Sequence, residues 1–315
     1  MENTVKPIVT LTRGTMFAGS NRFSFELLQS LFEQQPDRDI FVSSPVVYLP
    51  LALLRSVALG TTRTRMTQAL LMNELLTEEL RLEWVQTLVR ILNSESVSFG
   101  GTLVLTKHWG LSPKFIERAE DVFQILVSHE EVSQLQVRTR FVAQIALAER
   151  GKEAEQNKVR GIYVPDVSGK QALTLLTPPE AFFWQNKQKP LQELLCVLNE
   201  AYWLGWQMCF QDAEESRVKA LPLSKISGTF DLLPLLTGME LGPGITPSAD
   251  FSPMVVSGNP PYLAGLRHGF NLTITANQTH IANQTLRSSR PFVWFLTDIA
   301  SGLILALGVQ CESAS

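Results

Sequence analysis

The sequence predicts a mixed α+β fold, in one large domain or two ordinary ones, on three observations. In the first third of the chain, apolar residues recur three and four positions apart, which is the periodicity of amphipathic helices. From about Gly101 onward, short apolar runs lie between turn residues, which is typical of strands. The last run, residues 290–311, has two apolar halves around a turn at 300–302 and predicts a buried hairpin. At 315 residues, the chain is long enough to bury a large core.

The first third of the chain is expected to be mainly helical. Ser20, a preferred N-cap residue, precedes the first helix, whose apolar side chains recur at helical spacing until Pro36 ends it. A short strand at 40–44 leads to Pro45, which opens a long, apolar and therefore buried helix that stops near Gly60. Two amphipathic helices are then expected over 61–75 and 77–92.

The middle of the chain mixes both patterns. Strands are expected over 101–109 and 124–132, separated by a helix that begins near Ser112. The stretch 136–158 is interpreted as helical. The continuous apolar run 194–203 is interpreted as a strand that is buried on both faces. Residues 237–253, which follow a short helix at 231–236, are rich in glycine and proline and are expected to form an irregular connection.

The composition argues against several classes of partner. Charged residues make up 18% of the chain and the formal net charge is −3, so no overall positive field favours nucleic acid or acidic lipid. No apolar run reaches the roughly 18 to 20 residues needed to cross a bilayer, and the first residues lack a signal-peptide core. We therefore expect no nucleic-acid partner, no membrane partner, and a cytoplasmic or nuclear protein whose secretion would need an unconventional route. Three Asn-x-Thr sequons, at Asn271, Asn277 and Asn283, are interpreted as chance matches.

Residues that could carry catalysis or bind a metal are scattered. None of the histidines has a partner at metal-ligand spacing, so each is expected to face solvent or to serve the structure. Ser43 and Ser44 do not lie in a Gly-x-Ser-x-Gly turn, and the cysteines are expected to be reduced thiols. We expect no catalytic residue, no metal and no cofactor. The residues concerned are His108, His129, His268 and His280, with Cys196, Cys209 and Cys311.

Five collinear segments resemble the serpin superfamily. The stretch 20–62 is similar to the family's opening helix, Ile-Phe-x-Ser-Pro strand and buried second helix, and 103–127 is similar to its strand followed by a Phe-containing helix. The stretch 195–216 is similar to its Leu-Val-Asn-Ala-Ile-Tyr-Phe-x-Gly-x-Trp strand. Ala249-Asp250-Phe251-Ser252 and the closing hairpin complete the order. The matches are Asn199, Tyr202, Gly205, Trp206 and Phe210 in 195–216, and Arg290-Pro291-Phe292, Ser301-Gly302 and Leu307-Gly308 in the hairpin. The resemblance implies helices packed on a large central β-sheet.

Two departures from the family pattern shape the expected domain, which is 1–315. Only about 45 residues connect Asn199 to Ala249, where the family has several further strands. Conversely, residues 134–190 are longer than the family's one-helix connection at that place. We therefore expect a divergent insertion at 134–190, strands deleted between about 212 and 248, and reduced second and third sheets.

The resemblance also implies a reactive loop. In an inhibitory serpin, the target protease attacks a long loop, which then inserts as an extra strand into the main sheet with the trapped protease attached. The family's hinge reads Glu-Gly-Thr-Glu followed by alanines, and the polar near-repeat TANQTHIANQT, residues 275–285, aligns with it. The loop equivalent comprises Asn277, Gln278, Thr279, His280, Ile281, Ala282, Asn283, Gln284, Thr285, Arg287 and Ser288.

This loop departs from the family in chemistry and in length. Gln278 replaces a hinge glycine, and Asn283 and Gln284 bring amides to a segment that would have to be buried. Burying an unpaired amide costs about 1–3 kcal/mol. Only eleven residues separate Thr279 from Pro291, and at about 3.3 Å per residue they reach at most about 36 Å. We therefore predict a shortened loop that does not insert, and a protein that does not trap proteases covalently.

Three function hypotheses stay open. A non-inhibitory, serpin-like protein-binding or regulatory scaffold would contact an unidentified protein partner through the loop or through Phe182, Phe183 and Trp184, an aromatic cluster of the type enriched at interfaces. The alternative for that cluster is packing on the chain's own core. A structural protein would form homo-oligomers through exposed sheet edges. A reversible serine-protease inhibitor would use the Arg287–Ser288 bond. A shortened and rearranged serpin-like chain without a signal peptide resembles the relatives of host proteins that large DNA viruses carry. The first hypothesis therefore extends to a viral interaction protein.

Overall fold

The computed structural model describes residues 17–72, 77–178, 189–218, 221, 225–239, 241–276 and 291–311. The helices are α2 (Ala18–Gln34), α3 (Ser44–Val57), α4 (Gly60–Ala69), α5 (Glu78–Leu92), α6 (Pro113–Glu117), the π-helical turn η2 (Arg118–Val122), α7 (Lys189–Val197), α8 (Glu200–Asp212), α9 (Leu233–Gly238), α10 (Gly242–Ile245) and the 3₁₀ turn η4 (Ser252–Met254).

The strands fall into three sheets. They are β1 (Ile40–Val42), β2 (Val97–Thr106), β3 (Gly110–Leu111), β4 (Ile125–Glu130), β5 (Leu135–Leu147), β6 (Arg150–Gln156), β7 (Val159–Pro165), β8 (Gln171–Thr177), β9 (Glu215–Arg217), β10 (Lys225–Asp231), β11 (Val255–Ser257), β12 (Leu263–Ala276), β13 (Phe292–Asp298) and β14 (Ile304–Gln310). One sheet has the order β10-β12-β5-β2-β4, a second has the order β1-β14-β13-β8-β7-β6-β9, and β11 pairs with β3.

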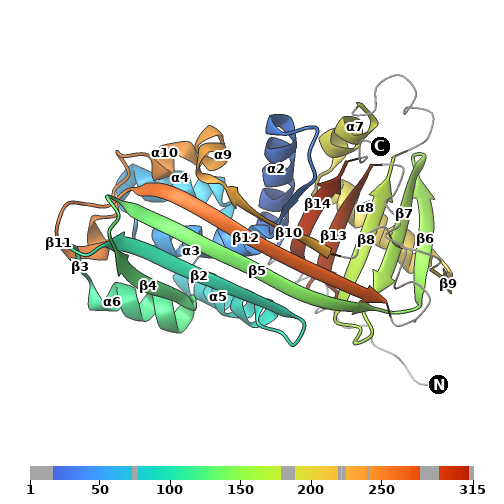
Figure 1. The fold of residues 1–315 in the computed structure, drawn as a ribbon, viewed down its shortest axis with the longest axis horizontal. Coiled ribbons are helices and arrows are strands. Elements are labelled where there is room, and N and C mark those ends of the chain that lie inside the picture. The colour runs from blue at the N-terminus through green and yellow to red at the C-terminus, as the bar shows by residue number, and fades with distance from the viewer. Residues whose placement is uncertain are drawn as a thin grey trace.

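The five-stranded sheet runs across the left and centre of an elongated molecule, and the seven-stranded sheet stands at its right end (Figure 1). In the five-stranded sheet, β12 runs parallel to β5 and β2 runs parallel to β4, while the other neighbours are antiparallel. The seven-stranded sheet is antiparallel throughout. The predicted α+β class, with helices packed on a central sheet, is confirmed. We expected a reduced second sheet. The second large sheet has seven strands, and residues 150–177 form three of them.

Helix α3 connects the two sheets. All its residues from Ser44 to Arg55 are buried, and it packs on β14 of one sheet and on β2 and β5 of the other. Pro45 lies in the first turn, where its fixed φ suits a helix and its missing N–H costs nothing. Figure 1 shows α3 and α5 behind the five-stranded sheet. Ser43, which immediately precedes α3, therefore lies against the buried face of the five-stranded sheet, near the middle of β12.

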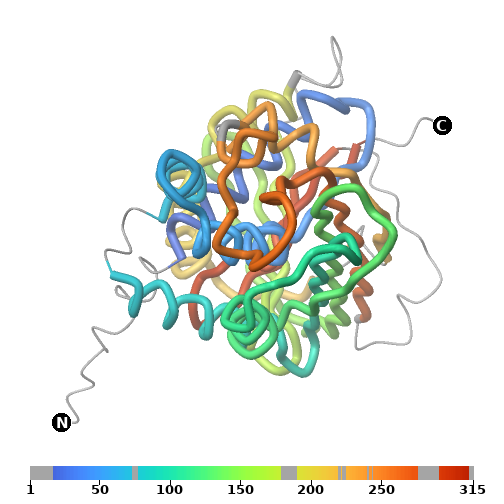
Figure 2. Tube along the Cα trace, turned by 90° about the vertical axis from the view of Figure 1, so that its left-hand side faces the viewer, coloured from blue at the N-terminus to red at the C-terminus, as the bar shows by residue number. Residues whose placement is uncertain are grey.

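Segments from opposite halves of the chain meet at the end of the molecule that faces the viewer in Figure 2. There α4 lies beside α10, and the hydroxyl of Thr62 accepts a hydrogen bond of 2.9 Å from the backbone N–H of Asp250. Within the described ranges, no helix is long and apolar enough to cross a membrane. The same ranges contain no group of three or more His, Cys, Asp or Glu residues arranged to hold a metal ion.

The elements with strong local signals are confirmed. They include α2 to α5, the strands at 97–106 and 125–130, and the terminal hairpin of β13 and β14. Helix α2 begins earlier than expected, so that Ser20 lies inside it, and its N-cap residue is Phe17. Thr77, by contrast, caps α5 with its side chain by accepting a hydrogen bond from the N–H of Leu80.

The predicted helix over 136–158 is wrong. The stretch forms β5 and β6, which are joined at Ala148 and Glu149. Along β5, odd-numbered residues are buried and even-numbered ones are more exposed, which is the period of two of a strand with one covered face. Its Ala, Gln and Arg residues favour helices locally, but pairing with β2 on one side and β12 on the other overrides that preference.

The predicted strand over 194–203 is also wrong, and with it the alignment of 195–216 with a strand of the family. Helix α7 ends at Val197, and the side chain of Asn199 then accepts a hydrogen bond of 2.9 Å from the N–H of Tyr202, which starts α8. Trp203, Trp206 and Phe210 form the buried face of α8. The deletion between about 212 and 248 was counted from this supposed strand, so it stays a prediction, as does the insertion at 134–190.

Candidate functional site: the seam between β5 and β12

The predicted site residues lie outside the described part of the chain. This holds for the loop equivalent, residues 277–288, and for the aromatic cluster at 182–184. The structure describes the elements on either side. The loop connects the end of β12 at Ala276 to the start of β13 at Phe292, and the cluster lies between β8 and α7.

The place where an extra strand would enter is the boundary between β5 and β12, which we call the seam. The two strands are parallel and paired from Leu263 opposite Leu135 to Ala276 opposite Leu147. A segment that followed β12 through a reverse turn would run antiparallel to both strands. It would therefore fit between them and form antiparallel ladders on both sides. In this structure β5 and β12 are paired directly, and the seam is closed.

His268 links the two strands of the seam through hydrogen bonds on the buried face of the sheet. Its imidazole is fully buried. Nε2 lies 3.1 Å from the backbone nitrogen of Ser43, and Nδ1 lies 2.9 Å from Oγ1 of Thr139 in β5. The Thr139 hydroxyl in turn lies 3.3 Å from the carbonyl oxygen of Arg267 in β12. One histidine thus connects both strands of the seam to the start of α3.

The partners of His268 determine its protonation. The backbone N–H of Ser43 can only donate, so Nε2 must accept, and the single proton of the neutral ring lies on Nδ1. Nδ1–H then donates to Thr139, whose hydroxyl donates to the Arg267 carbonyl. Burial lowers the pKa of His268 to about 3. The ring is therefore neutral at physiological pH, and every polar atom that it contacts is satisfied.

The seam also joins the second sheet. The Ser43 hydroxyl donates to the carbonyl oxygen of Leu305 in β14 at 2.6 Å. Next to His268 along β12, the ring of Phe270 stacks on Phe141 of β5 with centroids 5.1 Å apart. It also contacts Phe41 at 5.1 Å and Trp294 at 6.1 Å, both in the seven-stranded sheet. Separating β5 from β12 would therefore disturb aromatic packing between the two sheets.

The expectation for His268 is confirmed: it serves the structure. The burial of His268 could be predicted from the sequence. It alternates along the strand with the same spacing of two as Leu266, Phe270 and Leu272, which are all buried. Its hydrogen-bond partners, Ser43 and Thr139, could not be predicted in this way, because they are far from His268 in the sequence. Asn271, one of the three sequon residues, lies in the middle of β12 between β10 and β5.

Comparisons with known proteins agree with the fold. A family model described as "Serpin (serine protease inhibitor)" matches residues 18–144, whereas no individual curated protein matches the sequence significantly. Human thyroxine-binding globulin superposes with a TM-score of 0.80 at 16% identity, covering 96% of this chain and 100% of that one. Native protease nexin-1 with heparin gives 0.77 at 13%, covering 95% and 100%. Uncleaved ovalbumin gives 0.76 at 15%, covering 93% and 98%.

The superpositions cover at least 93% of this chain, so nearly the whole fold is shared with these solved structures. The identities are low, so the solved structures establish the fold, while the family model covers the helices and strands from α2 into β5. The motifs of 20–62 and of the terminal hairpin lie in the elements that the resemblance predicts. The chain therefore has the serpin fold, and its residues 18–144 match the serpin family model.

Proposed function

We propose that this chain is a non-inhibitory member of the serpin superfamily and acts as a protein-binding or regulatory scaffold, without loop insertion and without covalent trapping of a protease. The observation that carries the proposal is the length of the connection between β12 and β13. It comprises residues 277–291, which is fifteen residues, while β12 alone has 14 residues.

An intact connection is too short to fill the seam. A tethered loop must enter the sheet and return, and a reverse turn takes about two residues. Even if Phe292 lay beside Ala276, about six residues could enter, which is less than half of β12. Cleavage removes the need to return. If the Arg287–Ser288 bond is cut, residues 277–287 remain attached to β12, and about nine of them span about 30 Å beyond the turn. On the same rise per residue, the 14 residues of β12 span about 46 Å, so the attached protease would stop well short of the far end.

The seam itself resists entry. An inserted strand would have to break the β5 and β12 pairing over the stretch that it occupies, together with the Thr139 to Arg267 bond. The segment that would replace this pairing carries the amides of Asn283 and Gln284. Adjacent residues of a strand point to opposite faces, so one of the two amides would face the core, and burying it unpaired would cost about 1–3 kcal/mol. The balance therefore favours the closed sheet.

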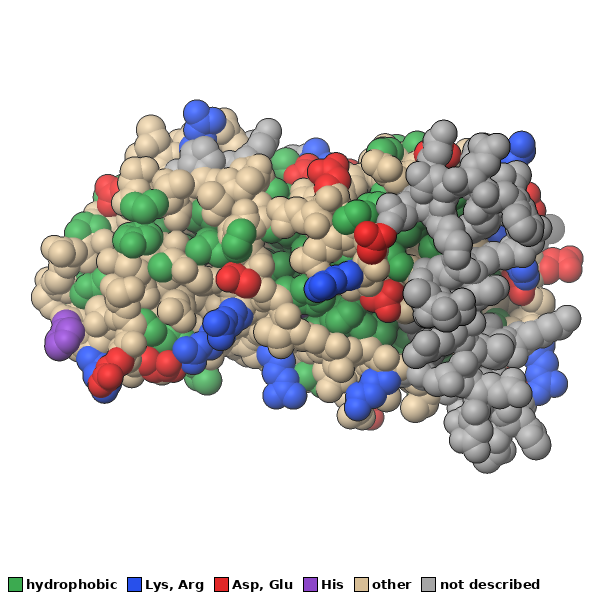
Figure 3. Space-filling model, turned by 45° about the horizontal axis from the view of Figure 1, so that its top comes forward, with side chains coloured by type: hydrophobic (Ala, Val, Ile, Leu, Met, Phe, Trp, Pro, Cys, Tyr) green, Lys and Arg blue, Asp and Glu red, His purple; other side chains and the backbone are tan. Residues whose placement is uncertain are grey.

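A partner surface is supported around α7 and α8. These helices directly follow the aromatic cluster of residues 182–184, and they expose Val197, Leu204 and Met208, of which Met208 is 65% exposed. Leu204 and Met208 are four residues apart and so lie on one helix face. On the face in Figure 3, the described hydrophobic side chains form small groups separated by polar and charged ones. Exposed methionine side chains are common at protein-binding surfaces, and aromatic residues are enriched at interfaces.

The partner claim is tested by affinity capture from cell extract with purified full-length variants. We expect a protein retained by the wild type to be lost when Phe182, Phe183 and Trp184 are replaced by alanine, and to be weakened by Met208→Ser. The control is Leu126→Ser, which removes an equally exposed apolar side chain from β4 and should leave capture unchanged. Equal retention by all variants would contradict the proposed surface.

Assembly through a sheet edge is the second candidate, and β4 favours it. This strand pairs only with β2 within the described residues, and Leu126 on it is 65% exposed. The N–H of Val127 donates to Oε1 of Glu120 at 3.4 Å, and a strand from another chain would replace that side-chain bond. Light scattering distinguishes the candidates: a stable oligomer that Leu126→Lys converts to monomer would favour assembly over the scaffold role.

A further inference from the structure

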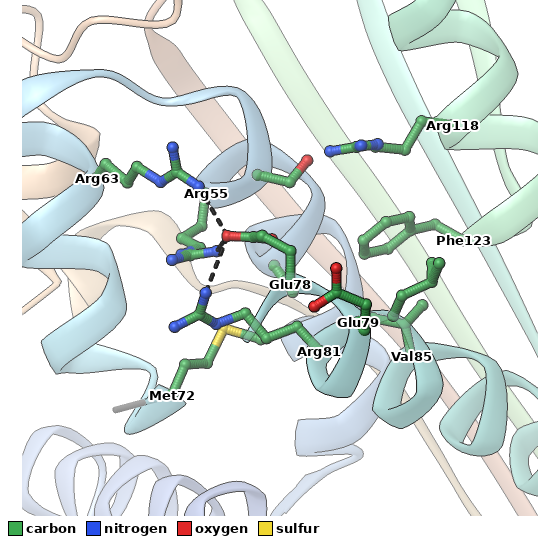
Figure 4. A pocket seen from close by; sticks show the side chains of 12 residues that line it. Arg55, Arg63, Met72, Glu78, Glu79, Arg81, Val85, Arg118 and Phe123 are labelled. Atoms are coloured by element: carbon green, nitrogen blue, oxygen red, sulfur yellow. Dashed lines mark hydrogen bonds and ion pairs between the residues drawn. The ribbon is translucent and has the colours of Figure 1, made fainter. Parts of the chain in front are cut away.

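A cavity of about 360 Å³ lies where α3, α4, α5 and η2 meet, away from the seam. Four arginines from these four elements line it: Arg55, Arg63, Arg81 and Arg118 (Figure 4). The size is within the range of pockets for small organic ligands. The concentration of guanidinium groups suggests an anion.

Three of the arginines share one carboxylate oxygen. Arg55, Arg63 and Arg81 hydrogen-bond to Oε1 of Glu78 at 3.1, 2.7 and 2.9 Å. Arg55 also donates from Nε to the hydroxyl of Thr67 at 2.9 Å. The Arg55 side chain is only 5% exposed, so its position is fixed by packing as well as by these bonds.

The carboxylates of the pocket do not balance its arginines. Against four guanidinium groups stand Glu78 and Glu79, which leaves an excess of two positive charges among the lining residues. Figure 4 shows Arg118 pointing into the cavity from the far side, and its side chain has no hydrogen-bond or ion-pair partner in the part of the chain that the structure describes. Nε of Arg81 is buried and lacks a hydrogen-bond partner there too. A buried donor without an acceptor, as at Nε of Arg81, is uncommon in native proteins. Together with the excess of positive charge, it indicates that an anionic acceptor belongs in the cavity.

The surroundings favour a ligand with an anionic end and an apolar end. The pocket lies at the N-terminus of α5, where the helix dipole attracts negative charge. Burial lowers the pKa of Arg55, which reflects poor solvation of its charge. Leu82, Val85 and Phe123 also line the cavity, and Figure 4 shows Phe123 and Val85 on the side away from Arg55. An aromatic or aliphatic group could pack there while the anion contacts the arginines.

We propose that this pocket binds a small organic phosphate, with the phosphate between Arg118 and the arginines around Glu78 and with the apolar part of the ligand against Phe123. A dianionic phosphate matches the excess charge of two. Its oxygens suit the fork of N–H donors that guanidinium groups present. Glu78 acts as the internal anion that holds the arginines in place when the pocket is empty.

The test is calorimetric titration of the full-length protein at constant ionic strength with phenyl phosphate, inorganic phosphate and benzenesulfonate. Phenyl phosphate should bind most tightly, because inorganic phosphate lacks the ring and benzenesulfonate carries only one charge. Arg118→Gln should weaken phenyl phosphate binding about tenfold or more, since it removes a charged donor from the phosphate. Arg118 is exposed and has no described side-chain partner, so this variant should fold.

Two further variants make the proposal specific. Arg90→Gln removes the same charge from an exposed position on α5 outside the pocket and should leave the affinity within about twofold. Glu78→Gln raises the excess charge and frees the arginines, so it should tighten binding rather than weaken it. Equal effects of Arg118→Gln and Arg90→Gln would overturn the proposal. So would the absence of millimolar phenyl phosphate binding in both the wild type and a folded Glu78→Gln variant.

Discussion

Replacing His268 by alanine should lower the free energy of unfolding by about 3–5 kcal/mol. The substitution leaves the backbone N–H of Ser43 without an acceptor and the hydroxyl of Thr139 without its donor, both in the interior of the protein. Each unsatisfied buried group costs about 1–3 kcal/mol, and the lost ring volume adds a cavity. Urea unfolding followed by circular dichroism measures the effect.

His129→Ala is the matched control for this substitution. His129 lies in β4 of the same sheet but is exposed, so its removal should change stability by less than about 0.5 kcal/mol. Similar effects of the two substitutions would mean that the His268 hydrogen bonds do not hold the seam.

Acid should weaken the wild type through His268. The ordinary pKa of 6.5 applies to the unfolded chain, and in the folded protein it falls to about 3. Between these values the unfolded state binds the proton and the folded state does not, so the free energy of unfolding falls as the pH drops from about 6.5 towards 3. The difference between wild type and His268→Ala should therefore shrink over this range.

Glu78→Gln should lower the free energy of unfolding by about 2 kcal/mol at neutral pH, because Arg55, Arg63 and Arg81 lose their shared carboxylate. The Glu78 side chain is 51% exposed, so solvent screening keeps the loss below that of a fully buried pair. Chemical unfolding at pH 7 measures it, and Glu83→Gln, at an exposed position of the same helix, is the control.

The Glu78 effect has its own pH range. Burial would raise the pKa of Glu78, but the hydrogen bond and charge of Arg55 and the other arginines outweigh this, so the pKa lies below the ordinary 4.5. The stabilisation is thus fully present above about pH 4.5 and disappears as the pH falls through the lower, folded pKa. Wild type and Glu78→Gln should converge in that range. A constant difference down to the acid transition would contradict the ion-pair account.

The sequence predicted best where local signals decide the structure. Pro45 at the start of α3 and the apolar hairpin of β13 and β14 are specified by residues that are neighbours in the chain. Prediction failed at 136–158 and 194–203. In the first stretch, pairing with distant strands overrides helix propensity, and in the second the capping side chain of Asn199 divides an apolar run into two helices.

The sites were harder to predict because tertiary structure assembles them. His268 and Ser43 are 225 positions apart in the chain, and nothing near either residue indicates the other. The four arginines of the pocket come from four elements, so no motif contains them. The loop equivalent was identified through the family resemblance, and its predicted behaviour rests on a residue count and on the length of β12.

The most direct test of the account is incubation of the full-length protein with a panel of serine proteases, including a trypsin-like enzyme, followed by denaturing electrophoresis. A known inhibitory serpin serves as the positive control, and mass spectrometry identifies the cut site. We predict cleavage between residues 277 and 291 with release of active protease and with no band heavier than either protein. An SDS-stable band that joins the protease to this chain through Arg287, or through any other residue of the loop, would contradict the account.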